Sequence, residues 1–117
     1  MALSISIPTG QYDAAGSMVN ASYWEIAYIN ANVINRTFTM QINGYASEAA
    51  FAANPQQAPL MSQMVMFPDL VNCPSAAWPF SPSLLQANFP NDPNAVLEAA
   101  QAYCQLYSMF VGSTIVA

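Results

Sequence analysis

The chain has 117 residues, of which 55% are hydrophobic and only 6% are charged, and its formal net charge is -5. Arg36 is the one basic residue, so the chain lacks the basic footprint needed to bind nucleic-acid phosphates or an anionic membrane, and we expect neither as a partner. The length suits one domain. The small number of charged residues favours a subunit whose surface is covered by other proteins, and the alternative is a monomer that is secreted or works in an acidic environment.

Residues 1–20 predict an N-terminal arm that begins with one short strand. Apolar residues alternate with serine in residues 3–7, which is the period of a strand. Pro8-Thr9-Gly10 is expected to end this strand, and residues 11–20 predict a loop. The start of the chain has no basic segment typical of a signal peptide, and no apolar run approaches the roughly 18 residues of a membrane-spanning helix. We therefore expect a soluble product made inside a cell.

Residues 22–44 predict a β-hairpin with one apolar and one polar face. Apolar and polar side chains alternate strictly in residues 37–43, and residues 23–34 are rich in aromatic and β-branched types. A two-residue turn at Asn35-Arg36 would set the register. The apolar pairs are then Val33 with Phe38, Ala31 with Met40, and Ile29 with Ile42. The polar pairs are Asn32 with Thr39, Asn30 with Gln41, and Tyr28 with Asn43.

The polar face of this hairpin is the first candidate contact surface. None of its six paired residues is charged, and a one-residue slip would mix the two faces. A solvated sheet face and a protein-contact surface both remain open. The candidate partner-contact residues on this face are Tyr28, Asn30, Asn32, Thr39 and Gln41.

Two short elements are expected to follow the hairpin. Residues 47–53, which place a glutamate after a serine among alanines, predict a short helix that ends before Asn54-Pro55. Residues 62–67 predict a strand with Met64 and Met66 on one side. Gln63, Val65 and Phe67 lie on the other side.

Residues 68–90 predict an ordered Pro-rich loop or an extended arm. The segment contains several prolines together with Trp78, Phe80 and Phe89, whereas disordered linkers are poor in large apolar residues. These three aromatic residues either hold the loop against its own domain or insert into a neighbouring protein. They complete the set of candidate partner-contact residues.

The C-terminal region predicts an amphipathic helix. Asp92 is a candidate N-cap, Pro93 suits the first helical position, and Gly112 can end the helix. The expected buried stripe is Val96, Leu97, Ala100, Tyr103, Cys104, Tyr107 and Phe110. Packing this stripe on the apolar hairpin face gives a single α+β domain, mainly an antiparallel β-sheet, with the C-terminal helix on one face. Residues 113–117 predict a final strand.

The side chains that most enzymes use are scarce in this chain. Without histidine or lysine, the usual general base, Schiff-base amine and imidazole ligand are missing. Cys73 and Cys104 are expected to be reduced, buried thiols, although a disulfide between them is the alternative, and without histidine they form no zinc site. We therefore expect a non-enzymatic protein with no metal and no cofactor.

Parts of the chain resemble small virion-associated proteins of tailed bacteriophages. The resemblance is carried by residues 21–26 (Ala-Ser-Tyr-Trp-Glu-Ile), residues 44–50 (Gly-Tyr-Ala-Ser-Glu-Ala-Ala) and Ala102-Tyr103 in the terminal helix. It implies a structural subunit that contacts copies of itself and other virion proteins, in the virion after synthesis in the host cytoplasm. The first expectation is a tail, baseplate or fibre-attachment component. The alternatives are a capsid decoration protein and a module that binds a host surface or glycan.

Overall fold

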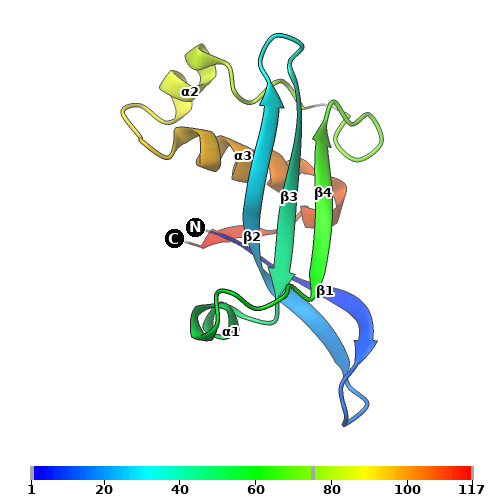
Figure 1. Cartoon of the computed structure of the whole chain (residues 1–117). Coiled ribbons are helices and arrows are strands. Elements are labelled where there is room, and N and C mark those ends of the chain that lie inside the picture. The colour runs from blue at the N-terminus through cyan, green and yellow to red at the C-terminus, as the bar shows by residue number, and fades with distance from the viewer. Residues whose placement is uncertain (1, 75, 117) are drawn as a thin grey trace.

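The computed structural model describes residues 2–74 and 76–116, so Met1, Ser75 and Ala117 lie outside the described residues. Its main feature is a five-stranded sheet in the order β4-β3-β2-β1-β5, in which all paired strands are antiparallel (Figure 1). The elements in chain order are β1 (Ala2–Tyr12), β2 (Met18–Asn32), β3 (Thr37–Tyr45), α1 (Glu48–Ala53), β4 (Met61–Phe67), α2 (Pro82–Asn88), α3 (Ala95–Leu106), the 3₁₀ helix η1 (Ser108–Phe110) and β5 (Thr114–Val116).

The core lies between one face of this sheet and α3. The rings of Phe38 and Tyr103 meet edge to face with centroids 5.0 Å apart, and the Cys104 thiol lies 3.5 Å from the sulfur of Met40. The predicted α+β fold with a C-terminal helix on one sheet face is therefore confirmed. None of the helices in the described residues is long and apolar enough to cross a membrane.

The β2–β3 hairpin keeps the predicted faces but not the predicted register. Its turn spans residues 33–36, so Ala31 pairs with Phe38 and Asn30 pairs with Thr39, a shift of two residues from the prediction. A two-residue shift leaves every side chain on its original face, because side chains alternate with a period of two. Val33, predicted to face Phe38, instead lies exposed in the turn.

The loop predicted for residues 11–20 is wrong. β1 continues to Tyr12, which pairs with Met18 of β2, and the Thr9 hydroxyl donates to the carbonyl of Val19 at 2.7 Å. The Asp13 carboxylate closes the turn by accepting from two backbone N–H groups, of Ala15 and Ser17. The result is a two-stranded ribbon at the lower end of the molecule in Figure 1.

The Pro-rich segment contains a helix that the sequence pattern did not predict. The Ser81 hydroxyl accepts from the N–H of Leu84, and Pro82 occupies the start of α2, which together form a standard helix start. Before this helix, Trp78 and Phe80 pack on Phe38 with ring centroids 5.9 Å and 5.2 Å away. The loop is therefore held against its own domain.

The remaining elements agree with the predictions except in α3. The short helix α1 and the strands β4 and β5 are confirmed, and the Ser47 hydroxyl caps α1. In α3, Asn94 rather than Asp92 is the N-cap, and Val96 is exposed whereas Gln101 is buried. The helix ends at Leu106, so Tyr107 and Phe110 reach the core from residues that follow α3.

Candidate interaction surface

The sheet face opposite α3 is largely uncovered, and we call it the open face. Only its lower end is covered, where Phe51 of α1 packs on Tyr23 and Tyr45 with ring centroids 5.5 Å and 4.7 Å away. The rest of the face is presented by three neighbouring strands, β2, β3 and β4. We define the open face by Tyr28, Asn30, Asn32, Thr37, Thr39, Gln41, Asn43, Ser62, Met64 and Met66.

The five candidate contact residues of the hairpin all lie on this open face. Tyr28 pairs with Gln41, and Asn30 pairs with Thr39. Asn32, Asn30 and Thr39 also line a hollow of about 410 Å³ at the upper end of the sheet. The structure thus brings the predicted polar residues together, although Tyr28 and Gln41 lie beside this hollow rather than in it.

Hydrogen bonds between side chains order the lower half of the open face. The Gln41 amide donates to the Asn43 side-chain oxygen at 2.9 Å, and the Ser62 hydroxyl donates to the same oxygen at 2.8 Å. The Tyr28 hydroxyl lies 3.8 Å from the Met64 sulfur. These contacts link β2, β3 and β4, so a partner would meet side chains that are already ordered and lose less conformational entropy on binding.

The candidate aromatic residues of the Pro-rich segment are separated from the open face. Trp78 is buried, and Phe80 packs with it against Phe38, which belongs to the opposite face of the sheet. Phe89 lies beyond α2 and lines an apolar cavity instead. Of the two alternatives for Trp78 and Phe80, the structure therefore shows contact with their own domain.

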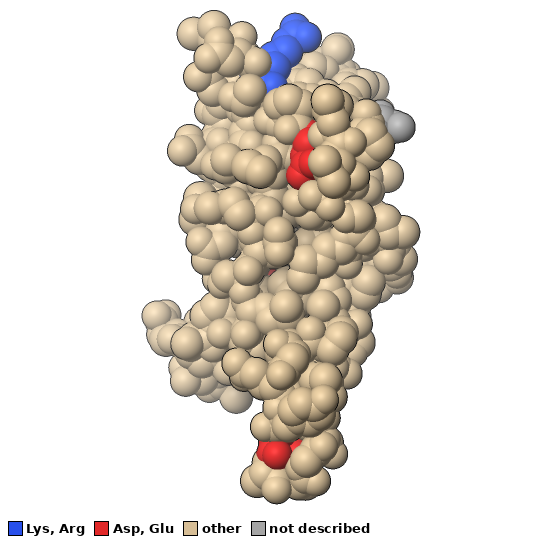
Figure 2. Space-filling model, turned by 90° about the vertical axis from the view of Figure 1, so that its right-hand side faces the viewer, with Lys and Arg blue, Asp and Glu red and all other residues tan. Residues whose placement is uncertain are grey.

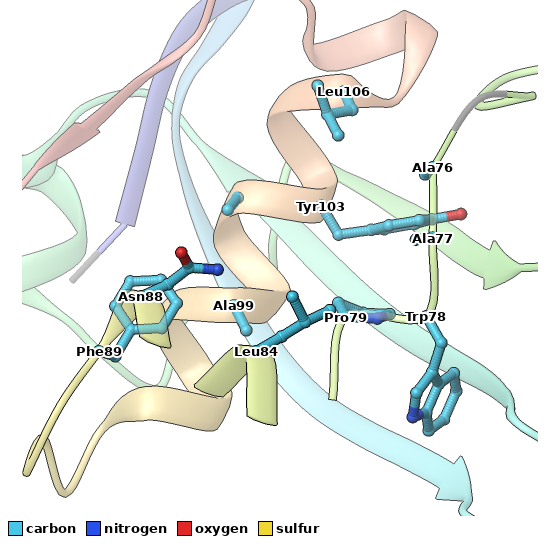
Figure 3. A pocket seen from close by; sticks show the side chains of 11 residues that line it. Ala76, Ala77, Trp78, Pro79, Leu84, Asn88, Phe89, Ala99, Tyr103 and Leu106 are labelled. Atoms are coloured by element: carbon cyan, nitrogen blue, oxygen red, sulfur yellow. The ribbon is translucent and has the colours of Figure 1, made fainter. Parts of the chain in front are cut away.

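This apolar cavity lies between residues 76–79, α2 and α3, and has a volume of about 300 Å³ (Figure 3). Small residues such as Ala76 and Ala99 leave the space, and Leu84 and Leu106 contribute apolar walls. The Tyr103 hydroxyl donates to the carbonyl of Met66 at 2.7 Å, and burial raises the pKa of this tyrosine. The cavity therefore offers apolar contact and no ready proton donor or acceptor for catalysis. Sequence reasoning missed it because α2 was not predicted.

Asp92, Glu98 and Asp69 are engaged in local interactions. The interaction between the carboxyls of Asp92 and Glu98 lowers the pKa of Asp92 and raises that of Glu98. The two carboxylates of a glycosidase instead flank the substrate, about 5–9.5 Å apart. Asp69 is occupied by three hydrogen bonds to its own loop, including two from Asn72. Within residues 2–74 and 76–116, no three side chains of His, Cys, Asp or Glu form a metal-binding group.

Cys73 and Cys104 are both free and buried. Burial raises the pKa of the Cys104 thiol to about 12, and it also raises the pKa of Cys73. A thiol is nucleophilic and binds metals only as the thiolate. Both residues therefore act as small core side chains near neutral pH. Neither provides a reactive thiolate at the surface.

Comparisons with protein-family models, with curated protein sequences and with solved structures find no match for this chain. They neither support nor oppose the resemblance to phage proteins. The surface chemistry of the chain itself is the basis on which its function can be argued.

Proposed function

We propose that this protein is a non-enzymatic structural subunit of a phage virion, in a tail, baseplate or fibre-attachment component that assembles through protein–protein contacts. The observation that carries this proposal is the open face: an ordered surface across three strands whose ten defining residues carry no charge. Glu25, which pairs with Asn43 and accepts from the Tyr23 hydroxyl, lies at its lower edge. Figure 2 shows how few charged atoms the adjoining side of the molecule carries. The phage setting rests on the sequence resemblance alone.

A charge-free polar surface is well suited to burial in an interface. Amides and hydroxyls cost less free energy to desolvate than ions do, and protein interfaces are depleted of charge and enriched in tyrosine and methionine at their centres. The open face presents Tyr28, Met64 and Met66 at 45%, 43% and 46% exposure. Methionine also adapts its shape to a partner. These properties support a contact surface over a merely solvated sheet face.

A capsid decoration protein is the second candidate, and the β1–β2 ribbon favours it. The ribbon extends away from α3 (Figure 1) and carries the exposed apolar side chains of Tyr12 and Met18 near its turn. Such a ribbon could clamp a neighbouring shell subunit. A glycan-binding module would need exposed aromatic rings beside carboxylates, and the burial of Trp78 removes the best candidate ring.

The molar mass of the purified protein in solution, combined with peptide mapping of intact particles by mass spectrometry, tests this proposal. We expect a defined oligomer and recovery of the protein in the tail fraction. A monomer that is recovered with capsids would support the decoration function instead. Absence of the protein from particles would refute both virion functions.

The open face itself is tested by Thr39→Lys. We expect self-association to weaken roughly tenfold or more, because an interface would bury a charge that has no partner there. Light scattering over a concentration series measures this change, and circular dichroism checks that the fold is kept. The control is Ala87→Lys, which adds the same charge at an exposed position of α2. Equal self-association of both variants and the wild type would show that the open face is not an interface between copies of this chain.

A further inference from the structure

A second surface of the protein combines apolar walls with acidic side chains. A groove of about 470 Å³ lies between α2 and the start of α3, and we call it the α2–α3 groove. It is lined by Pro82, Leu85, Gln86, Phe89, Asn91, Asp92, Pro93 and Ala95. Because apolar groups dominate the walls while a carboxylate stands at one end, the groove suits an apolar segment that also carries a cation.

The acidic end of the groove has more negative charge than Asp92 alone supplies. Glu98 on α3 lies near Asp92, and the interaction with the Asp92 carboxyl raises the pKa of Glu98. Two carboxyl groups held this close repel each other when both are ionised. A cation placed beside them would relieve this repulsion, which is why the pair favours a basic partner.

The other carboxylates with hydrogen-bond partners are already engaged within the domain. Asp13 closes the turn of the β1–β2 ribbon, Asp69 orders its own loop, and Glu25 accepts the Tyr23 hydroxyl at 2.7 Å. Asp92 also accepts from the N–H of Asn94 at 2.8 Å, but only through one of its oxygens. The groove is therefore a place where negative charge and apolar surface occur together.

The turn between β2 and β3 carries a positive charge and exposed apolar side chains, which are complementary to the acidic and apolar groove. Arg36, the one basic residue of the chain, lies exposed in this turn beside the apolar side chains of Val33 and Ile34. Ile34 is 93% exposed, the highest value among the exposed large apolar residues. The Asn32 side chain accepts from the N–H of Asn35 at 3.0 Å, which orders the turn.

We infer that the β2–β3 turn of one copy docks into the α2–α3 groove of a second copy, where Arg36 pairs with Asp92 and Glu98. Ile34 and Val33 then lie against the apolar walls. A second copy is the occupant because its turn carries a cation, Arg36, beside two exposed apolar side chains, which matches the apolar walls and the carboxylate of the groove. This inference rests on the proposed function as an assembly subunit, and it assigns one of its contacts.

Such a contact joins two different surfaces of the same protein. A heterologous contact of this kind repeats from copy to copy and forms a ring where the rotation closes, or a filament where it does not. Each copy therefore has one free turn and one free groove until the assembly closes. Because the turn and the groove are different surfaces, one mutation can disable the turn and leave the groove intact, and another can do the reverse.

The test uses two variants that each remove one half. Arg36→Glu disables the turn, and Gln86→Arg disables the groove by adding bulk and positive charge at an exposed lining residue. Alone, each variant should self-associate roughly tenfold or more weakly than the wild type, as expected when an interfacial charge pair is broken. Mixed together, they should form a one-to-one complex through this contact, because each supplies the half that the other lacks. Sedimentation velocity measures these species.

The matched control for the groove is Ala87→Arg, which adds the same charge at the next residue of α2, outside the groove lining. It should self-associate within about twofold of the wild type, since its charge stays in solvent. Failure of the mixed variants to form a one-to-one complex would overturn the inference. If the wild type still assembles and Arg36→Glu does so equally well, the proposed assembly function survives and only this contact is refuted. A wild type that remains monomeric would overturn both.

Discussion

Replacing Phe38 with alanine is expected to lower the free energy of unfolding by about 3–5 kcal/mol, the usual cost of removing a buried aromatic side chain. Phe38 is where β3, the Pro-rich segment and α3 meet. Its ring lies 5.6 Å from that of Phe67 and 5.0 Å from that of Tyr103, and it also contacts Trp78 and Phe80. The cavity left by the ring cannot be filled by any one of these neighbours without breaking its other contacts.

Urea denaturation at a fixed protein concentration measures this loss. The emission of Trp78 should also shift to the red in the folded variant, because the loop loses the ring against which it packs. Leu70→Ala is the control, since Leu70 is 78% exposed and its truncation should change stability by no more than about 0.5 kcal/mol. A Phe38→Ala variant as stable as this control would contradict the packing described for the Pro-rich segment.

Replacing Trp24 with alanine should have a comparable effect, again about 3–5 kcal/mol. Trp24 is fully buried, its ring meets that of Phe110 edge to face at 5.1 Å, and its indole N–H donates to the carbonyl of Ile5 at 3.1 Å. The substitution removes the packing and also leaves this carbonyl without its donor. Thermal and urea unfolding followed by circular dichroism would measure the loss.

The same indole explains why residue 44 is glycine. A Cβ atom at Gly44 would lie 2.8 Å from the Trp24 ring and 2.9 Å from the Cβ of Ala21. Gly44→Ala should therefore destabilise the wild type by about 1–3 kcal/mol through overpacking. In the Trp24→Ala background the part of this penalty that comes from the ring should disappear, whereas the close contact with the Ala21 Cβ remains. Additive effects of the two substitutions would contradict this close packing.

These three stability predictions depend on protein concentration where the chain self-associates. An interface formed only by the folded state adds apparent stability by mass action. Comparing each variant with its control at one concentration therefore isolates the packing contribution. The turn and groove variants are expected to self-associate more weakly, so the same substitutions can be measured again in them with a smaller contribution from assembly.

Several features of the fold and of the candidate surface follow from local patterns in the sequence. The strict alternation in residues 37–43 determines which side chains of β3 face the core, and the charge-free polar face follows from the same alternation. The cap at Ser47 and the alanine-rich residues after it determine α1. The amino-acid composition, which contains no histidine and no lysine, by itself removes the acid–base and nucleophilic chemistry of these two side chains.

Other features required the tertiary structure. The alternation of apolar and polar residues indicates on which face of the sheet a side chain lies, but not which residue of the neighbouring strand it pairs with. A two-residue shift of β2 against β3 preserves every face, so the pattern could not distinguish the real register from the predicted one. A bulge between Ile26 and Tyr28 lets Ile26 and Ile29 both reach the core, although their spacing breaks the alternation.

The sequence alone thus determined the elements whose signal is local: the alternating strand, the capped helix, the amphipathic terminal helix and the lack of charge. The tertiary structure decided that Trp78 and Phe80 belong to the core, that residues 18–20 extend β2, and that α2 and α3 enclose a groove. The physical reason is that burial and strand pairing depend on residues far apart in the chain. Phe38 and Trp78 lie forty positions apart, and no local pattern links them.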